Sequence, residues 1–309
     1  MSSTKRSAIA VAAVLCLGLF GAASCARAKP GTFKTPEEAV QALADLIGAG
    51  DKQRVEEIFG PDSFEMFSSG DEVADQGDFQ RVKSMILESV AFKDDDETTK
   101  IVLLGKAQWP FPIPLVLEEG RWRFDTAAGR EELENRRVGR NELLTIAALR
   151  EAVEAQREYH AEGRDGLPPA YAQKIRSSRG KHDGLYWPTN EGEPLSPLGE
   201  LFAQAAARGY HPDEEPTPDP YSGYYFDVLK GQGKNAPGGE RGYLDKNGLM
   251  TGGFAAIAWP AKYGNSGVMT FMVSDRGMVF QKDLGKETDK IAKAITVYDP
   301  DLTWDPTPD

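Results

Sequence analysis

The first helix that the hydrophobic pattern predicts begins at Pro36. Thr35 precedes it as a candidate N-cap, and Glu38 follows three residues later, which is the spacing of a capping box. Apolar residues then recur three and four positions apart, as on the buried face of a helix: Ala39, Val40, Leu43, Leu46 and Ile47. A short helix is expected next over residues 52–59, and a third around Phe79.

After an acidic turn the pattern changes to that of β-strands. Residues 98–104 are β-branched and apolar, and residues 112–125 are divided by Glu118-Glu119-Gly120 in the manner of a hairpin. Helices followed by a small antiparallel sheet predict an α+β domain over residues 29–135. On this pattern alone, the domain resembles the cystatin and nuclear-transport-factor-like folds.

The second half of the chain follows a different plan. We expect a long helix from Asn141 to about His160 and a shorter one over residues 197–208, with a turn-rich aromatic loop between them. The remaining hydrophobic runs are short and separated by turns, as in an antiparallel meander: residues 221–229, 249–259, 267–274 and 278–283. A meander packed on the long helix predicts a second α+β domain over residues 136–309.

A second resemblance concerns the arrangement of elements in the C-terminal half. It rests on the helix segments 141–150 and 155–159 and on the hairpins that end over residues 267–279. They look like the exposed part of the main helix and the sheet of a type IV pilin or pseudopilin. The resemblance implies a long helix packed on an antiparallel sheet. The membrane-spanning start and peptidase site of a pilin have no counterpart here, which excludes pilin-type assembly through an apolar helix.

The chain begins with the three zones of a secretory signal. Lys5 and Arg6 are followed by an uncharged apolar run over residues 8–20 and then by small residues. Cleavage after Ala28 would release a soluble protein, so residues 1–28 are interpreted as a signal peptide. Alternatively, Ala22-Ala23-Ser24-Cys25 resembles a lipoprotein box, in which Cys25 is acylated and anchors the protein to a membrane. We therefore expect an exported protein that is either periplasmic or lipid-anchored in the cell envelope.

Composition narrows the classes of partner. Cys16 and Cys25 are the only cysteines, so the chain after the signal has no disulfide. Removal of residues 1–28 takes away three cationic residues and no acidic residue, which changes the formal net charge from −12 to −15. An acidic surface repels phosphate backbones and anionic lipid, which argues against nucleic acid and leaves a lipid anchor as the expected membrane contact.

No motif marks a catalytic or cofactor site. His160, His182 and His211 are not spaced as the ligands of a zinc hydrolase, and the glycines form neither a nucleophile elbow nor a dinucleotide-binding motif. The acidic runs at 94–97 and 213–215 lack the alternating ligands of a calcium loop. The sequence therefore predicts no catalytic residue, no metal ligand and no cofactor, and it favours a protein that is not an enzyme.

Aromatic residues beside prolines are the candidate contacts with a partner. Rigid, exposed aromatic rings are typical of protein and glycan contact surfaces, and the candidate binding residues are Trp109, Phe111, Tyr186, Trp187 and Tyr224. The alternative interpretation is that these rings pack in the cores.

Several arginines lie where the two domains should join. They form either an anion-binding patch or ion pairs with nearby glutamates three and four residues away, and the spacing favours the pairs. The arginines are Arg130, Arg136, Arg137 and Arg140, and the glutamates are Glu131, Glu132, Glu134 and Glu142.

Long aromatic motifs spread over the chain carry a family resemblance. They are residues 109–115, 121–130, 137–143, 183–188, 221–226 and 252–260. They resemble the bacterial domain-of-unknown-function family 2950 over about residues 33–305. The resemblance implies an exported protein of unassigned activity and supplies no site residues.

Three functions remain open on the sequence. The first is a non-catalytic binding or assembly module whose partner is another envelope protein or a glycan. The second is a hydrolase of wall or glycan material that uses paired carboxylates, with Asp125 and Asp183 as candidates. The third is a carrier that holds a small ligand against the sheet of the N-terminal domain.

Overall fold

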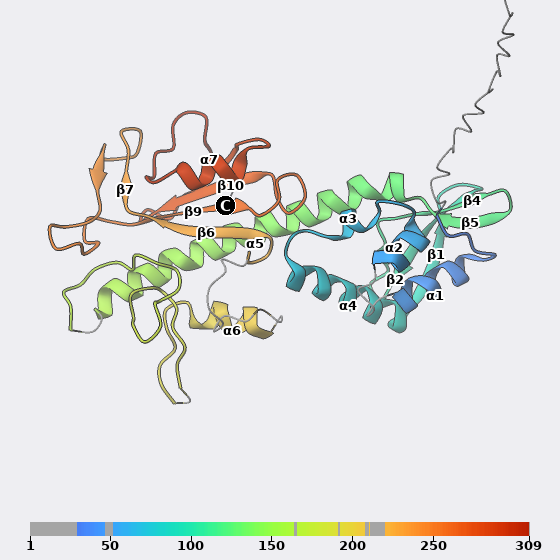
Figure 1. Cartoon of the computed structure of the whole chain (residues 1–309), viewed down its shortest axis with the longest axis horizontal. Helices are drawn as coiled ribbons and strands as arrows, with labels where there is room; N and C mark the ends of the chain where they lie inside the picture. Colours follow the sequence, from blue (N-terminus) through green and yellow to red (C-terminus); the bar gives the residue numbers. More distant parts are fainter. Residues whose placement is uncertain are drawn as a thin grey trace, which may run out of the picture.

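The protein is elongated, with two lobes joined by one long helix (Figure 1). The computed structural model describes residues 30–46, 52–163, 166–190, 192–207, 210 and 220–308. Helices and antiparallel sheets confirm the α+β class. The expected signal peptide and Cys25 lie outside the described residues, as do Ile47, His211 and the acidic run 213–215. Within the described residues, no helix has the length and apolar character needed to cross a membrane.

The N-terminal lobe (residues 30–125) begins with helices that pack on a small sheet. They are α1 (Pro36–Leu46), α2 (Lys52–Phe59), α3 (Phe64–Phe67) and α4 (Glu72–Glu88). At the start of α1, Thr35 Oγ1 accepts a hydrogen bond from Glu38 N at 3.2 Å, as the capping box predicts. The Glu38 carboxylate accepts from Lys34 N at 2.8 Å, one residue earlier than the standard box would place it.

The sheet of this lobe is antiparallel, in the order β1-β2-β4-β5, with β3 paired to β2. Its strands are β1 (Val90–Asp94), β2 (Thr99–Leu104), β3 (Trp109–Pro110), β4 (Leu115–Glu118) and β5 (Arg121–Phe124). The expected hairpin is present as β4 and β5, in which Leu115 pairs with Phe124. Large apolar side chains close the space between the sheet and the helices: Phe59, Met66, Val102, Leu104, Ile113 and Phe124.

The helix α5 (Thr126–Glu162) runs through both lobes. The prediction that it begins at Asn141 is wrong, because it begins fifteen residues earlier, after Asp125, whose side chain accepts from Ala128 N. Residues 126–140 contain few apolar positions and gave no helical period. Ion pairs one turn apart support this segment instead, among them Arg136–Glu132 at 2.6 Å. The expected boundary between residues 135 and 136 therefore falls inside a continuous helix.

The C-terminal lobe (residues 166–308) contains the expected meander. Its antiparallel sheet has the order β12-β11-β10-β9-β6. The strands are β6 (Tyr224–Leu229), β9 (Ala255–Pro260), β10 (Met269–Ser274), β11 (Val279–Asp283) and β12 (Asp305–Pro306). Two further strands, β7 (Gly231–Gln232) and β8 (Arg241–Gly242), form a separate ribbon.

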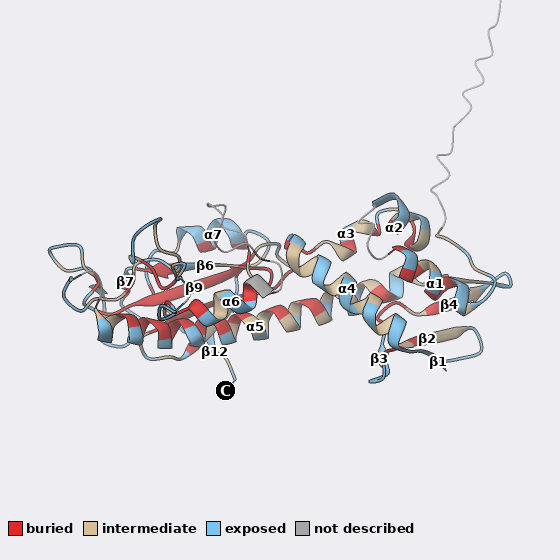
Figure 2. Ribbon diagram, turned by 90° about the horizontal axis from the view of Figure 1, so that it is seen from below, coloured by how far each residue is buried: buried red, intermediate tan, exposed pale blue. Residues whose placement is uncertain are grey.

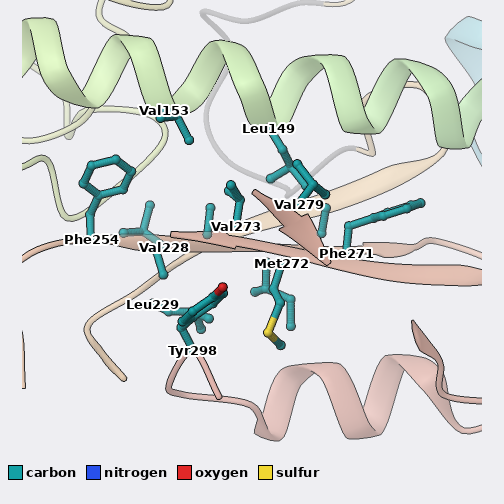
Figure 3. Packing of buried hydrophobic residues seen from close by; sticks show 14 of the residues in the cluster. Leu149, Val153, Val228, Leu229, Phe254, Phe271, Met272, Val273, Val279 and Tyr298 are labelled. Carbon is teal, nitrogen blue, oxygen red and sulfur yellow. The ribbon is translucent and has the colours of Figure 1, made fainter. Parts of the chain in front are cut away.

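Helices cover both faces of this sheet. Figure 3 shows Leu149 and Val153 of α5 directed at Phe271 and Val273, whereas Met272 points to the opposite face, toward α7 (Thr288–Ala294). This alternation places β10 between two layers, and Phe271, Met272 and Val273 are all almost fully buried. Figure 2 shows that buried residues concentrate in this sheet and along α5.

A long excursion over residues 166–207 packs on α5 from another side. It ends in α6 (Gly199–Ala207), close to the expected helix over 197–208. Its cluster joins three residues of α5 to residues of the excursion: Ala152, Ala155, Tyr159, Ala172, Leu185, Tyr186 and Leu198. Between α5, this excursion and the sheet remains an apolar space of only about 10 Å³, near the size that one water molecule needs.

Candidate binding surfaces

Three of the five candidate aromatic residues lie inside the protein. Tyr224 has no exposed surface, and its hydroxyl donates to Met269 O at 3.0 Å. Phe111 is 5% exposed, and Tyr186 is 9% exposed. A ring in such a position stabilises a core and offers almost no area to a partner. The geometry of these three residues fits the alternative interpretation that they are core residues.

Trp109 is half-buried and holds α5 to the N-terminal sheet. The Arg136 guanidinium lies 5.2 Å from the centroid of the Trp109 ring, and Arg136 Nη1 donates to Pro110 O at 2.6 Å. These contacts use the face of the ring that a ligand would stack on. Trp109 is therefore mainly a structural contact between β3 and α5.

Trp187, like Trp109, is partly exposed to solvent, and it lies beside the last turns of α5. Its ring centroid lies 4.5 Å from that of the exposed His182 and 6.5 Å from that of Tyr159. The Tyr159 hydroxyl donates to His182 O, which attaches this group to the last turns of α5. The three rings form a small aromatic platform beside a cationic loop.

The cationic loop covers residues 174–182, and we call it the basic loop. Backbone hydrogen bonds fix it against the following segment: Leu185 N donates to Lys174 O at 3.1 Å, and Ser177 N donates to Tyr186 O at 2.8 Å. The two segments cross closely at Gly184. A Cβ at that position would lie 2.5 Å from backbone atoms of the loop, so the crossing requires glycine.

Asp183 anchors the loop from within. Its carboxylate accepts from Ser178 N at 2.6 Å and from Lys174 Nζ at 2.8 Å. Burial alone would raise the pKa of Asp183, but the hydrogen bonds from Lys174 and Ser178 outweigh burial and lower it to about 2. Asp183 is therefore ionised at neutral pH and acts as a structural acceptor.

The arginines near the middle of α5 do not form an open anion site. Arg130 pairs with Glu134 at 4.0 Å and Arg136 pairs with Glu132, as the spacing favoured. Arg140 instead makes two hydrogen bonds to Asp78 of α4, at 2.8 and 2.6 Å.

Arg137 is 8% exposed and reaches both lobes. It donates to Met66 O in the N-terminal lobe and to Asn265 Oδ1 in the C-terminal lobe, each at 2.6 Å. Burial lowers the pKa of Arg137, while the carboxylates of Asp75 and Asp78 act in the opposite direction. The spacing favoured an ion pair between Arg137 and a glutamate of its own helix, but the described residues contain no such pair.

Asp71 is a second buried link between the lobes, which sequence reasoning missed. It caps α4 by accepting from Ala74 N at 2.9 Å. Its other oxygen accepts from Gly223 N at 2.9 Å and from the Tyr210 hydroxyl at 2.7 Å. Burial and the neighbouring Asp71 raise the pKa of Tyr210. An aspartate before a helix usually indicates a cap alone, so its sequence gave no sign of the distant partners.

Asp125 and Asp183 lie at opposite ends of α5. Asp125 precedes the first residue of the helix, and Asp183 follows His182, which is bonded to Tyr159 near the last turn. At a rise of 1.5 Å per residue, the helix separates the two regions by about 50 Å. Paired carboxylates in glycosidases stand at most about 9.5 Å apart. These two residues therefore cannot act on one bond.

Several histidine and acidic side chains that the sequence singled out make structural contacts in the described part of the chain. No group of three or more His, Cys, Asp or Glu residues is placed to hold a metal ion there. His160 stacks on Tyr171 at 4.4 Å instead of facing another ligand. In the turn after β1, Asp96 accepts from the backbone and hydroxyl of Thr98, as in an ordinary turn. In the N-terminal lobe, Phe59 and Phe124, with centroids 4.9 Å apart, pack in the core beside the sheet.

Comparisons with known proteins place the chain in a family. No curated protein and no solved structure gave a match, so the pilin-like and nuclear-transport-factor-like arrangements have no support beyond the sequence pattern. The family model described as a protein of unknown function, DUF2950, matches residues 31–307. That range includes both lobes and the helix that joins them, and the chain belongs to the DUF2950 family.

Proposed function

We propose that this protein is an exported, non-catalytic binding or assembly module of the cell envelope. The observation that carries the proposal is the basic loop, a fixed element that is attached to the core by Ile175 and exposes residues 179–182 to solvent. Arg179 and Lys181 extend from it into solvent, and they make no ion pair with any residue that the structure describes. The signal-like pattern over residues 1–28 supports export.

The connection between the lobes also favours a scaffold role. Asp71 and Arg137 are buried polar groups whose hydrogen bonds cross from one lobe to the other. Buried polar contacts of this kind favour one relative orientation, because a shifted lobe would leave them unsatisfied. We propose that residues 29–135 and 136–309 are two structural units that share α5 and keep a fixed distance.

The two alternatives have less support. A hydrolase that used Asp125 and Asp183 would need them on one cleft, and α5 separates them. A carrier would need room beside the N-terminal sheet, where Phe59, Phe111 and Phe124 pack against one another. A hydrolase would need other catalytic residues than Asp125 and Asp183, and a carrier would need a binding surface other than the N-terminal sheet.

Two measurements test the proposal. Mass spectrometry of the mature protein, isolated from its host envelope, should show either a chain that begins at Lys29 or an acylated Cys25. An unprocessed chain found in the cytoplasm would refute export. The Cys25→Ala variant separates the two forms, because it should release the protein from membranes only if Cys25 carries lipid.

The second measurement is capture of envelope components on the immobilised protein. A specific component should be retained by the wild type and lost with Arg179→Ala/Lys181→Ala. The matched control is Lys286→Ala/Lys290→Ala, which removes two exposed charges from the region of α7. If the two double variants retain the same material as the wild type, the basic loop is not the binding element and the proposal fails.

A further inference from the structure

The charge of the basic loop is opposite to that of the whole protein. The chain has 48 acidic and 36 basic residues, yet residues 174–182 contain four cationic residues and no acid. They are Lys174, Arg176, Arg179 and Lys181. Asp183 neutralises Lys174 alone, through their ion pair at 2.8 Å. Glu193 is a second acidic residue near the loop, and hydrogen bonds from Asn190, together with a weaker Coulombic interaction with His182, lower its pKa. A local excess of positive charge therefore remains.

The overall negative charge does not cancel this excess. At physiological ionic strength, charges separated by more than about 8 Å are largely screened from one another. A bound anion would respond mainly to the exposed Arg179 and Lys181 and to their immediate neighbours. The net negative charge of the protein would repel anions from most other surfaces. An anionic ligand would therefore bind at the loop in preference to the rest of the surface.

The loop is held rigid before any ligand binds. The Arg176 guanidinium lies 5.7 Å from the centroid of Phe202, and Phe202 stacks on Tyr186 with centroids 3.9 Å apart and planes within 5°. Asp183 and the close crossing at Gly184 fix the other side. A preorganised site loses less conformational entropy on binding.

A partly exposed aromatic platform lies next to these cations. Trp187 packs against His182 and Tyr159, and this supports its ring at the surface. Amphipathic rings with a fixed position contact the apolar faces of sugars, and cationic side chains beside them bind the charged substituents. Cations spaced along one loop suit an extended ligand with repeated charges better than a single ion.

We propose that the basic loop and Trp187 bind a polysaccharide that carries anionic groups. Arg179 and Lys181 contact its charged substituents, and Trp187 contacts a sugar ring. This inference rests on the proposed binding function and names the chemistry of the partner. A protein partner is the competing occupant, and the experiment below separates the two.

The experiment measures binding of the purified protein to defined polymers. Dextran sulfate carries charge on sugar, neutral dextran carries sugar alone, and linear polyphosphate carries charge without sugar. We expect dextran sulfate to bind more tightly than polyphosphate of the same charge, and neutral dextran to give no measurable binding. Raising the salt concentration should weaken the binding, because each cation that contacts the polymer releases counterions.

Variants test the named residues. Arg179→Ala/Lys181→Ala should weaken dextran sulfate binding at least about tenfold and reduce the slope of log affinity against log salt by about 1.4, at roughly 0.7 per lost contact. Trp187→Leu should weaken dextran sulfate binding several-fold and leave polyphosphate binding unchanged. The control Lys286→Ala/Lys290→Ala removes the same charge and should change neither value.

Three results would overturn the inference. Equal loss of affinity in both double variants would mean that the polymer senses only total charge. Equal binding of polyphosphate and dextran sulfate, with no effect of Trp187→Leu, would remove the sugar contact. If the polymers do not bind but loop-dependent capture of an envelope protein persists, the binding function stands and the glycan assignment fails.

Discussion

Asp71 provides the sharpest test of how the two lobes are joined. The Asp71→Ala substitution removes the acceptor for Ala74 N, Gly223 N and the Tyr210 hydroxyl. Loss of a helix N-cap costs about 1 kcal/mol. The buried Gly223 N and the partly buried Tyr210 hydroxyl each lose their acceptor, at about 1–3 kcal/mol for each donor. We therefore expect the free energy of unfolding to fall by about 3–7 kcal/mol.

Urea unfolding followed by tryptophan fluorescence measures this change. Trp109 and Trp122 report on the N-terminal lobe, and Trp187, Trp259 and Trp304 report on the C-terminal lobe. Single-tryptophan versions of the wild type should unfold at one common midpoint. In the Asp71→Ala background the two lobes should separate into two transitions, because the substitution removes a contact between them.

Two matched substitutions define what would refute this reasoning. Asp71→Asn keeps an acceptor for Ala74 N and should cost less than Asp71→Ala. Glu72→Ala changes the adjacent, exposed acid in the first turn of α4 and should cost no more than about 0.5 kcal/mol. If Asp71→Ala and Glu72→Ala have equal effects, Asp71 is only a surface cap and the contact between the lobes is not significant.

Three further predictions concern the second contact between the lobes, at Arg137, and the basic loop. Arg137→Lys should lower the free energy of unfolding in urea by about 1–3 kcal/mol, at least as much as Arg137→Met does. Lysine keeps a buried charge but cannot reach both Met66 O and Asn265 Oδ1. A larger loss in Arg137→Met than in Arg137→Lys would show that the charge is solvated. Lys174→Ala should raise the pKa of Asp183 from about 2 toward the ordinary value of 3.8, measured by NMR titration. Since the folded-state pKa is lowered, the contribution of Asp183 to stability is present above pH 3.8 and is lost as the pH falls toward 2; an unchanged pKa in the variant would rule out the Lys174 contact. Gly184→Ala should abolish dextran sulfate binding, since the added Cβ would lie 2.5 Å from the loop backbone. At Gly139, in the middle of α5, an added Cβ meets no atom within 4 Å. Gly139→Ala should therefore raise the free energy of unfolding by about 1 kcal/mol.

The regular elements of this fold could be predicted from sequence because each is a hydrophobic run or stripe that ends at turn or capping residues. The meander is an example: β9, β10 and β11 match the hydrophobic runs that the turns separate. The start of α5 could not be predicted in this way. Its first fifteen residues bury little on either side, so ion pairs and the cap by Asp125 replace the apolar stripe.

The candidate surface was only partly predictable, for a related reason. Sequence identifies a tryptophan or a tyrosine but not the neighbours that cover it. Trp187 and Tyr224 looked equivalent as aromatic residues, yet Tyr224 is fully buried under Gly267, where a Cβ would lie 2.0 Å from its hydroxyl. The cations of the basic loop lie within one stretch of the chain, residues 174–182, but their arrangement depends on the crossing at Gly184, which the sequence does not reveal.

The long helix α5 connects the two cores and the basic loop into one rigid unit. Leu133 of α5 packs on the N-terminal core, Leu149 packs on the C-terminal core, and Tyr159 packs under the excursion that bears the basic loop. A helix that contributes to three clusters cannot bend without disrupting at least one of them. Together with the buried contacts of Asp71 and Arg137, it holds the loop about 50 Å from Asp125 at the start of the helix. Binding at the loop is then not weakened by the entropy of a hinge, and a ligand held there has a fixed position relative to the N-terminal lobe.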